Sequence, residues 1–243
     1  MLRNYVKVAF RTLKRHAGYA ALNVAGLAVG LAACLAIGLY LWHELSYDRF
    51  HTKADRIVRV VQAATYEEAF GPSSERMLDG IATMPPGLAQ ALQERFPQIE
   101  QATVVGQERN FLLGRGERRL YVDRAFRADT AFFDVFSFEL VRGNPATALD
   151  APGRIVLTES LAERLFETDN PMGQTVVYEN EAEYEVTGIV ADPPSTSHLQ
   201  FEALLALTEA QRQERYGDIV RWNFFGDYIY LALREGTDPR ALE

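Results

Sequence analysis

An uncharged stretch at residues 17–42 constrains this chain more than any other feature of its sequence. At a rise of about 1.5 Å per residue, a helix of this length crosses the hydrocarbon core of a bilayer, which is about 30 Å thick. Helix is the form expected for a single span, because every backbone amide in lipid must find its hydrogen-bond partner within the segment. We therefore predict a transmembrane helix over residues 17–43.

The segment in front of this stretch is basic. No acidic residue precedes Glu44, and the positive residues are Arg3, Lys7, Arg11, Lys14 and Arg15. By the positive-inside rule, residues 1–16 are expected in the cytoplasm and everything after Trp42 outside it. Four of the basic residues recur at spacings of three and four. Residues 1–16 are therefore predicted to form an amphipathic helix that lies against anionic membrane lipid.

Two alternatives to a permanent span are a cleaved secretory signal and a lipoprotein anchor. A cleaved secretory signal has an apolar core of about 7–15 residues followed by small residues, whereas this run is longer and ends near Trp42. The segment Leu31-Ala32-Ala33-Cys34 resembles a bacterial lipobox, which would make Cys34 a lipidated amino terminus. Because the apolar run continues beyond Cys34, we favour the uncleaved span, in which Cys34 is a small packing residue.

Small residues recur along one side of the predicted span. Gly26 and Gly30 are four residues apart, and Cys34 continues the spacing, while Asn23 lies near the same stripe. Small residues let a second helix approach closely, and an asparagine in lipid favours a hydrogen-bond partner. We predict a helix-packing face at Asn23, Gly26, Gly30 and Cys34, whose partner helices come from outside this sequence.

The remaining sequence is typical of an acidic domain. Once the five basic residues before the span are set aside, 20 of the 25 lysines and arginines remain against all 33 acidic residues. Such a balance offers no basic patch for phosphates, so nucleic acid is not an expected partner. Cys34 is the single cysteine, which leaves residues 44–243 without a disulfide.

Alternating apolar residues and turn signals predict an α+β fold for residues 44–243. Helices are expected at 86–96 and, capped by Thr158, up to Phe166. Strands or extended apolar segments are expected at 56–61, 101–106, 111–113, 120–122, 155–157, 175–178, 184–190, 199–205 and 228–233.

Motifs for catalysis are absent from the sequence. It contains no phosphate-binding loop ending in Gly-Lys-Ser/Thr, no Gly-x-Ser-x-Gly elbow and no His-Glu-x-x-His helix, so we expect neither an enzyme nor a cofactor. Glu44, Asp48 and His51 would share a face if the helix continued past the membrane, but we favour a capped helix end over a metal site there. The run of alternating glutamates at 179–185 is interpreted as a solvated strand face.

The segment that leaves the membrane carries a family resemblance. It reads Glu44-Leu45-Ser46-Tyr47-Asp48-Arg49-Phe50-His51 and continues with Ala54-Asp55-Arg56-Ile57-Val58-Arg59-Val60. Further motifs follow in order at residues 132–138, 143–145, 155–160, 170–173 and 186–190, after an opening at 4–13 and 23–30. Together they resemble permease subunits of the MacB/FtsX-like ABC transporter family. Within them we single out a membrane-exit motif of Glu44, Ser46, Tyr47, Asp48, Phe50 and His51.

The resemblance implies a single span followed by a mixed α/β periplasmic core domain of two lobes, in a bacterial inner membrane. It further implies a permease that relays ATP-driven motion to the periplasm for export or extraction of substrate. The implied partners are a cytoplasmic ABC ATPase, further permease spans or a second permease copy, and a periplasmic adaptor protein. Family members have at least four spans, so this chain is expected to stop where the helix toward the next span begins, near Thr237 to Glu243. The alternative is a stand-alone, membrane-anchored periplasmic binding or sensor protein.

Overall fold

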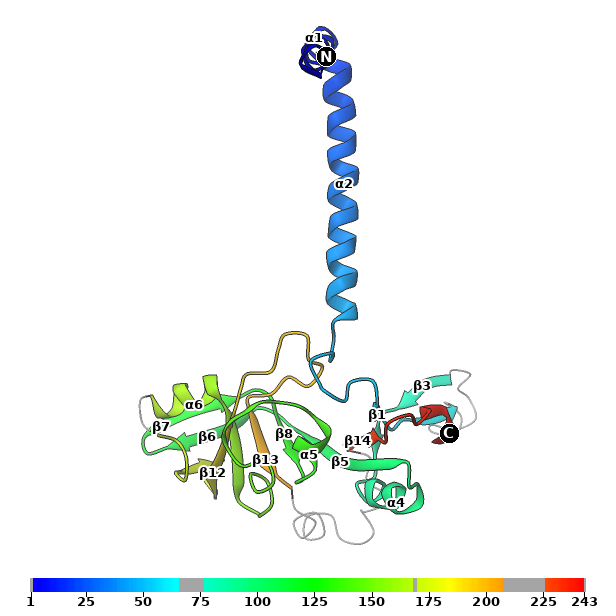
Figure 1. Ribbon diagram of the computed structural model, residues 1–243. Coiled ribbons are helices and arrows are strands. Elements are labelled where there is room, and N and C mark those ends of the chain that lie inside the picture. The colour runs from blue at the N-terminus through cyan, green and yellow to red at the C-terminus, as the bar shows by residue number, and fades with distance from the viewer. Residues whose placement is uncertain (1, 66–76, 168–169, 208–225, 243) are drawn as a thin grey trace. The chain divides into compact units, whose positions relative to one another are not determined.

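The computed structural model describes residues 2–65, 77–167, 170–207 and 226–242. The chain divides into two compact units, Met1–Tyr47 and Asp48–Glu243. The first unit consists of α1 (Leu2–Arg15) and α2 (Ala17–Leu45), shown in blue in Figure 1.

The second helix, α2, confirms the helix predicted over residues 17–43 and extends it by two residues. It is 29 residues long, and no side chain in it is buried. Within the described part of the chain it is the one helix that is long and apolar enough to cross a membrane. An exposed surface of leucine, valine and alanine over this length is unfavourable in water and favourable in lipid.

The second unit is built on one mixed sheet, which confirms the predicted α+β class (Figure 1). Two pairs of neighbouring strands are parallel, β10 with β12 and β8 with β13, and the other pairs are antiparallel. In spatial order the strands are β1 (Ile57–Arg59), β14 (Asp227–Leu233), β5 (Ile99–Glu108), β8 (Ala125–Ala128), β13 (Ala203–Ala206), β10 (Arg154–Thr158), β12 (Ala182–Val190), β11 (Thr175–Tyr178), β6 (Phe111–Arg115) and β7 (Arg118–Val122).

Several shorter elements complete this unit. β4 (Thr83–Met84) pairs with β14, β9 (Leu140–Gly143) pairs with β12, and β2 (Gln62–Thr65) forms a separate two-stranded sheet with β3 (Met77–Ile81). The helical elements are α4 (Gly87–Arg95), α5 (Phe132–Val135), α6 (Glu159–Phe166) and the 3-10 turn η1 (Pro239–Leu242).

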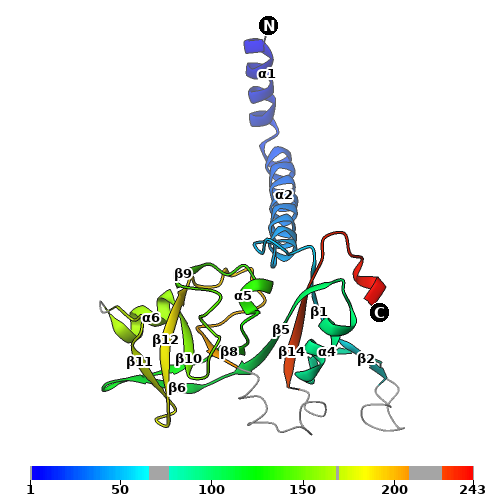
Figure 2. The same ribbon diagram turned by 60° about the horizontal axis from the view of Figure 1, so that its bottom comes forward.

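The long strand β5 joins two halves of the sheet (Figure 2). Its residues from Ile99 to Gly106 pair with β14, and those from Val105 to Glu108 pair with β8. Buried apolar side chains form three clusters along the sheet, one beside α4, one beside α6 and one beside α5. The two expected lobes therefore share a single sheet.

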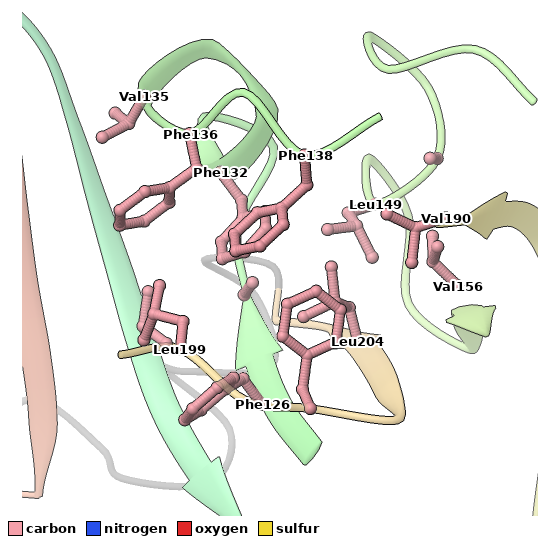
Figure 3. Packing of buried hydrophobic residues seen from close by; sticks show 14 of the residues in the cluster. Phe126, Phe132, Val135, Phe136, Phe138, Leu149, Val156, Val190, Leu199 and Leu204 are labelled. Carbon is pink, nitrogen blue, oxygen red and sulfur yellow. The ribbon is translucent and has the colours of Figure 1, made fainter. Parts of the chain in front are cut away.

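The cluster beside α5 is rich in aromatic rings (Figure 3). Phe132 and Phe138 are stacked, with ring centroids 5.7 Å apart, and Phe136 lies 5.0 Å from Phe132. These rings come from the 132–138 segment, one of the motifs that carried the family resemblance. The spacing of that motif is thus explained by core packing, since a short helix turns its aromatic residues onto the sheet.

The family motifs at residues 143–145 and 186–190 meet on paired strands whose backbones approach closely. Gly143 in β9 is paired with Gly188 in β12. A Cβ atom on Gly143 would lie 2.6 Å from the Thr187 carbonyl oxygen, and the residue has a φ of +105°, which L side chains rarely adopt. Only glycine satisfies both conditions at this point of the sheet.

Local sequence signals account for α6 and for the β6–β7 hairpin. Thr158 caps α6 by accepting a hydrogen bond from the Leu161 amide at 3.3 Å, as predicted. The residues of α6 that face the sheet are buried, and they are Leu161, Ala162, Leu165 and Phe166. In the hairpin, Gly116 takes the left-handed conformation that the tight turn requires, with a φ of 57°.

Three predicted elements differ from the structure. β1 covers residues 57–59 rather than 56–61. Residues 199–202 are not strand, because Leu199 is held in a local turn by hydrogen bonds of its backbone amide and carbonyl with the Ser197 hydroxyl. The expected helix start after Thr237 is a 3-10 turn, in which the Asp238 carboxylate accepts the Arg240 amide at 3.0 Å; Glu243 lies outside the described residues.

Candidate functional site

The candidate site is the segment that connects α2 to the first strand of the sheet. We call residues 48–60 the exit segment. At its start, Asp48 has a φ of 58°, a conformation that aspartate tolerates better than most residues. Its amide donates to the Thr196 carbonyl (2.9 Å), and its Oδ1 accepts the His198 amide (3.0 Å). Asp48 therefore fastens the exit segment to the loop before β13.

The Asp48 side chain also begins a hydrogen-bonded chain that ends on the sheet. Its Oδ2 lies 2.8 Å from Nδ1 of His198, and Nε2 of His198 lies 2.9 Å from the Tyr230 hydroxyl on β14. Burial raises the pKa of Tyr230 to about 12, although the nearby Arg59 acts in the opposite direction. Tyr230 is therefore a neutral hydroxyl at physiological pH.

His51, three residues after Asp48, is buried among aromatic rings. Its ring centroid lies 3.9 Å from that of Phe50, 5.3 Å from Phe136 and 5.1 Å from Phe138. Its Nδ1 accepts a hydrogen bond from the Ser137 amide (3.1 Å). Burial lowers the pKa of His51 to about 4, with Asp48 opposing this shift and His198 adding to it. The imidazole is therefore neutral near pH 7.

Polar contacts attach the middle of the exit segment to α5 and β5. The Thr52 amide donates to the Ser137 hydroxyl at 3.0 Å. Lys53 Nζ donates to the Asp134 carbonyl (2.8 Å) and to Glu100 (2.9 Å). Arg56 binds the same Glu100 carboxylate and the Leu233 carbonyl. Hydrogen bonds from Lys53 and Arg56 lower the pKa of Glu100, so its carboxylate stays ionised.

A cavity of about 450 Å³ is lined in part by Asp48, His51, His198 and Tyr230. We call it the His51 pocket. Its lining residues come from the exit segment, the aromatic cluster, the loop before β13 and β14, and they are Asp48, His51, Ala54, Ile57, Arg59, Phe136, His198 and Tyr230. A mixed apolar and polar lining in a cavity of this size is typical of small-ligand sites.

The shared face of Glu44, Asp48 and His51, which we regarded as less favoured than a capped helix end, does not form. α2 ends at Leu45, where the Ser46 side chain donates to the His43 carbonyl (2.7 Å). The left-handed backbone at Asp48 then turns the chain away from helical geometry. In the described ranges no group of three histidine, cysteine or acidic residues could hold a metal ion.

The alternating glutamates also differ from their predicted arrangement. Glu179 has a left-handed backbone and belongs, with Glu181, to the turn before β12, whereas Glu183 and Glu185 lie in β12 and are exposed. The Glu179 carboxylate accepts the Leu112 amide at 2.6 Å. The four residues therefore do not share one strand face, because a turn divides them.

The predicted helix-packing face is open in the described chain. Asn23 and Cys34 are exposed, and no atom lies within 4 Å of a Cβ placed on Gly26 or Gly30. This surface is compatible with a second helix, and the identity of its partner stays a prediction.

Several partners of the exit segment were missed by sequence reasoning. Asp48 and His51 were singled out, but His198 and Tyr230, which complete their surroundings, were not. These residues lie 150 and 182 positions beyond Asp48 in the sequence. The four histidines have no regular spacing, so nothing in the sequence signals that two of them line one pocket.

Similarity to known proteins is seen in both sequence family and fold. The family model described as the MacB-like periplasmic core domain matches residues 20–243. No curated protein matches the sequence.

Three solved structures are similar in fold. A domain of a protein assigned as a permease from Porphyromonas gingivalis has a TM-score of 0.66 at 24% identity, over 79% of this chain and 78% of that one. The periplasmic region of MacB from Actinobacillus actinomycetemcomitans has a TM-score of 0.52 at 15% identity, over 76% and 78%. The extracellular domain of the noncanonic ABC-type transporter YknZ from Gram-positive bacteria has a TM-score of 0.54 at 12% identity, over 76% and 88%.

Proposed function

The chain belongs to the family of MacB-like periplasmic core domains, and on that premise we propose that it acts as a permease subunit of an ABC transporter. In this role it relays ATP-driven motion from the cytoplasm to the periplasm, for export or extraction of a substrate. Its partners are a cytoplasmic ABC ATPase, further permease spans or a second permease copy, and a periplasmic adaptor protein. The chain itself catalyses no reaction.

The observation that supports this role is the attachment of the exit segment. Only Ser46 and Tyr47 separate the end of α2 from Asp48, so any movement of α2 enters the second unit through this connection. Between Asp48 and Arg56 the segment is bonded to the loop before β13, to α5, to β5 and to β14. A segment fixed at so many points passes displacement on instead of absorbing it.

Inserting a flexible linker tests this relay. Two glycines placed between Tyr47 and Asp48 should abolish transport in the assembled transporter while ATP hydrolysis by the ATPase continues. The matched control places the same two glycines in the β6–β7 turn, between Gly116 and Glu117, which is exposed. Normal transport with the linker after Tyr47 would contradict a mechanical role for the exit segment.

We propose that α2 spans the inner membrane with residues 1–16 in the cytoplasm and residue 50 onward in the periplasm. The five basic residues before the span support this orientation. An alkaline phosphatase reporter fused after Phe50 should be active, because that enzyme matures only outside the cytoplasm. An inactive fusion that is nevertheless inserted in the membrane would reverse the orientation.

A second candidate function is that of a stand-alone, membrane-anchored binding or sensor protein. The His51 pocket favours this candidate, since a relay alone needs no cavity. Labelling with a radioactive fatty acid separates the candidates. The permease proposal expects no label, whereas label that disappears on Cys34→Ser would indicate a lipoprotein anchor.

A further inference from the structure

Arg49 is an exposed arginine whose backbone is fixed on both sides. Asp48, directly before it, donates its amide to the Thr196 carbonyl at 2.9 Å. Phe50, directly after it, packs on the aromatic cluster, with its ring centroid 5.5 Å from that of Phe138. The Arg49 side chain is exposed and makes no hydrogen bond or ion pair with any residue that the structure describes. A fixed backbone thus presents a guanidinium whose donors are free for a group from outside the chain.

The position of Arg49 in the chain limits where that group can come from. α2 has 29 residues and is therefore about 44 Å long, close to the thickness of about 40–45 Å of a bilayer with its headgroups. Arg49 comes four residues after Leu45, the last residue of α2, and four residues span at most about 14 Å. Residues 46–50 form turns, so the distance is shorter still. Whatever the orientation of the second unit, Arg49 stays close to the lipid headgroups when α2 crosses a membrane.

The loop before β13 is held beside Arg49 and shares this position. Thr196 of the loop is the acceptor for Asp48, the residue that precedes Arg49. A backbone hydrogen bond of 2.9 Å closes the loop, and residues 194–195 at its tip are exposed. These two residues are proline and serine, so the tip carries no charge that would repel an anion.

The chemistry of the guanidinium selects one partner at this depth. Phosphate is the negative group that membrane phospholipids share, and a guanidinium binds phosphate through two parallel hydrogen bonds. The neighbouring Asp48 carboxylate does not occupy Arg49, because it is bonded to His198. Other arginines, such as Arg124, are also exposed, but no short covalent connection holds them near the end of α2.

We propose that Arg49 and the tip of the loop before β13 form a membrane-contact surface, on which the Arg49 guanidinium binds the phosphate of a phospholipid. Such binding holds the start of the second unit against the bilayer, at the point where the chain leaves α2. The inference rests on α2 as a membrane anchor, as in the proposed function, but it does not depend on transport.

The test places nitroxide labels at three positions of the full chain in phosphatidylglycerol nanodiscs. Cys34 is the single cysteine and carries the first label, and Cys34→Ser provides the background for Ser195→Cys and Glu117→Cys. Power-saturation EPR measures the access of oxygen, which concentrates in lipid, and of a nickel chelate, which stays in water. The label at 34 should be immersed, and the label at 195 should be partly shielded from nickel. The label at 117 is the exposed reference, since β7 lies at the opposite end of the sheet from β1.

Arg49→Gln tests the arginine itself. The variant should fold, because the guanidinium has no partner among the described residues. The ratio of lipid-contacting to free states should fall about fivefold, as for one arginine near a charged lipid surface, so nickel should reach the label at 195 more readily. Arg124→Gln is the matched control and should leave nickel access unchanged.

A lipid without phosphate tests the ligand. In nanodiscs of digalactosyl diacylglycerol, the wild type should show the nickel access at 195 that Arg49→Gln shows in phosphatidylglycerol. Adding Arg49→Gln in the galactolipid should change nothing further, because the group that the arginine binds is already missing.

Three results would overturn the proposal. They are equal nickel access at 195 and 117, unchanged access in Arg49→Gln, and equal access in the phospholipid and the galactolipid. If nickel reaches the label at Cys34, the membrane anchor fails and this inference fails with it. An immersed Cys34 together with a freely accessible residue 195 overturns this inference alone and leaves the anchor standing.

Discussion

α2 and the exit segment are neighbours in the chain, yet they hold their conformations in opposite ways. The hydrogen bonds of α2 are local to the helix, and none of its side chains is buried. The exit segment has little regular structure and is fixed by bonds to residues between 47 and 177 positions away. The side chains of α2 are therefore open to lipid or to other helices, whereas the exit segment finds its partners within the second unit.

The largest difference between the two regions is expected in the free energy of unfolding, when a residue of the aromatic cluster is truncated. Phe132 is fully buried, and Phe132→Ala should lower the free energy of unfolding by about 3–5 kcal/mol, through lost transfer energy and the cavity left behind. Leu27→Ala on α2, where the side chain is 74% exposed, is the control. It should leave the free energy of unfolding unchanged. Urea denaturation measures both. Equal losses would remove the distinction between the two regions.

Acid should weaken the second unit through His51. Its pKa is about 4 in the folded chain and about 6.5 when unfolded, so between these values the unfolded state binds more protons. Stability contributed by the neutral ring is complete above pH 6.5, falls as the pH drops toward 4, and amounts to about 3 kcal/mol at most. Urea denaturation at several pH values should show the free energy of unfolding decreasing as the pH falls. His51→Phe should reduce this dependence on pH. A dependence that persists in His51→Phe would assign it to other groups.

Association of α2 with another helix should respond to its small residues. Gly26→Leu with Gly30→Leu should weaken helix association in membranes by about 1–2 kcal/mol, because bulky side chains prevent close approach. Val29→Leu is the control, since it changes a neighbouring position that is not part of the small-residue stripe. Energy transfer between labelled copies in vesicles reports the change. If the double variant associates as well as the control, the glycine face contacts lipid.

The smallest effect is expected at Asp48. Asp48→Asn keeps an oxygen that can accept the His198 amide but removes the charge opposite the His198 ring. Because the pair is partly exposed, stability should fall by about 1 kcal/mol or less, and less still in high salt. Asp55→Asn, an exposed carboxylate on the same segment, is the control. A loss of several kcal/mol would show that the pair acts as a buried network.

Features set by neighbours in sequence could be predicted from the sequence. The length of α2 follows from an uncharged run, the start of α6 from the hydroxyl of Thr158, and the β6–β7 turn from its glycine. Each depends on residues within a few positions of one another, where backbone geometry allows few alternatives. The family motifs were also visible, although their physical roles, such as the pairing of Gly143 with Gly188, became clear only with the sheet.

The candidate site could be predicted only in part, because it is assembled across the fold. Asp48 and His51 belong to the membrane-exit motif, and the continued helix face that was the less favoured alternative for them does not form. The left-handed turn at Asp48 is stabilised by Thr196 and His198, which are close in space only after the strands have paired. Likewise, the low pKa of His51 results from burial by rings of the 132–138 segment, which no local pattern around His51 indicates.

The position of β14 in the sheet has a consequence for the order in which this chain can fold during synthesis. β14 is the last of the described strands in sequence, but it lies between β1 and β5 and supplies both with hydrogen-bond partners. A ribosome releases β1 and β5 more than a hundred residues before Leu233, so in the interval both strands have an open edge facing where β14 will lie. Open edges pair readily with other chains, and contacts between distant residues form slowly. Nascent copies crowded at one insertion site are therefore most exposed to mispairing just before synthesis of this segment is complete.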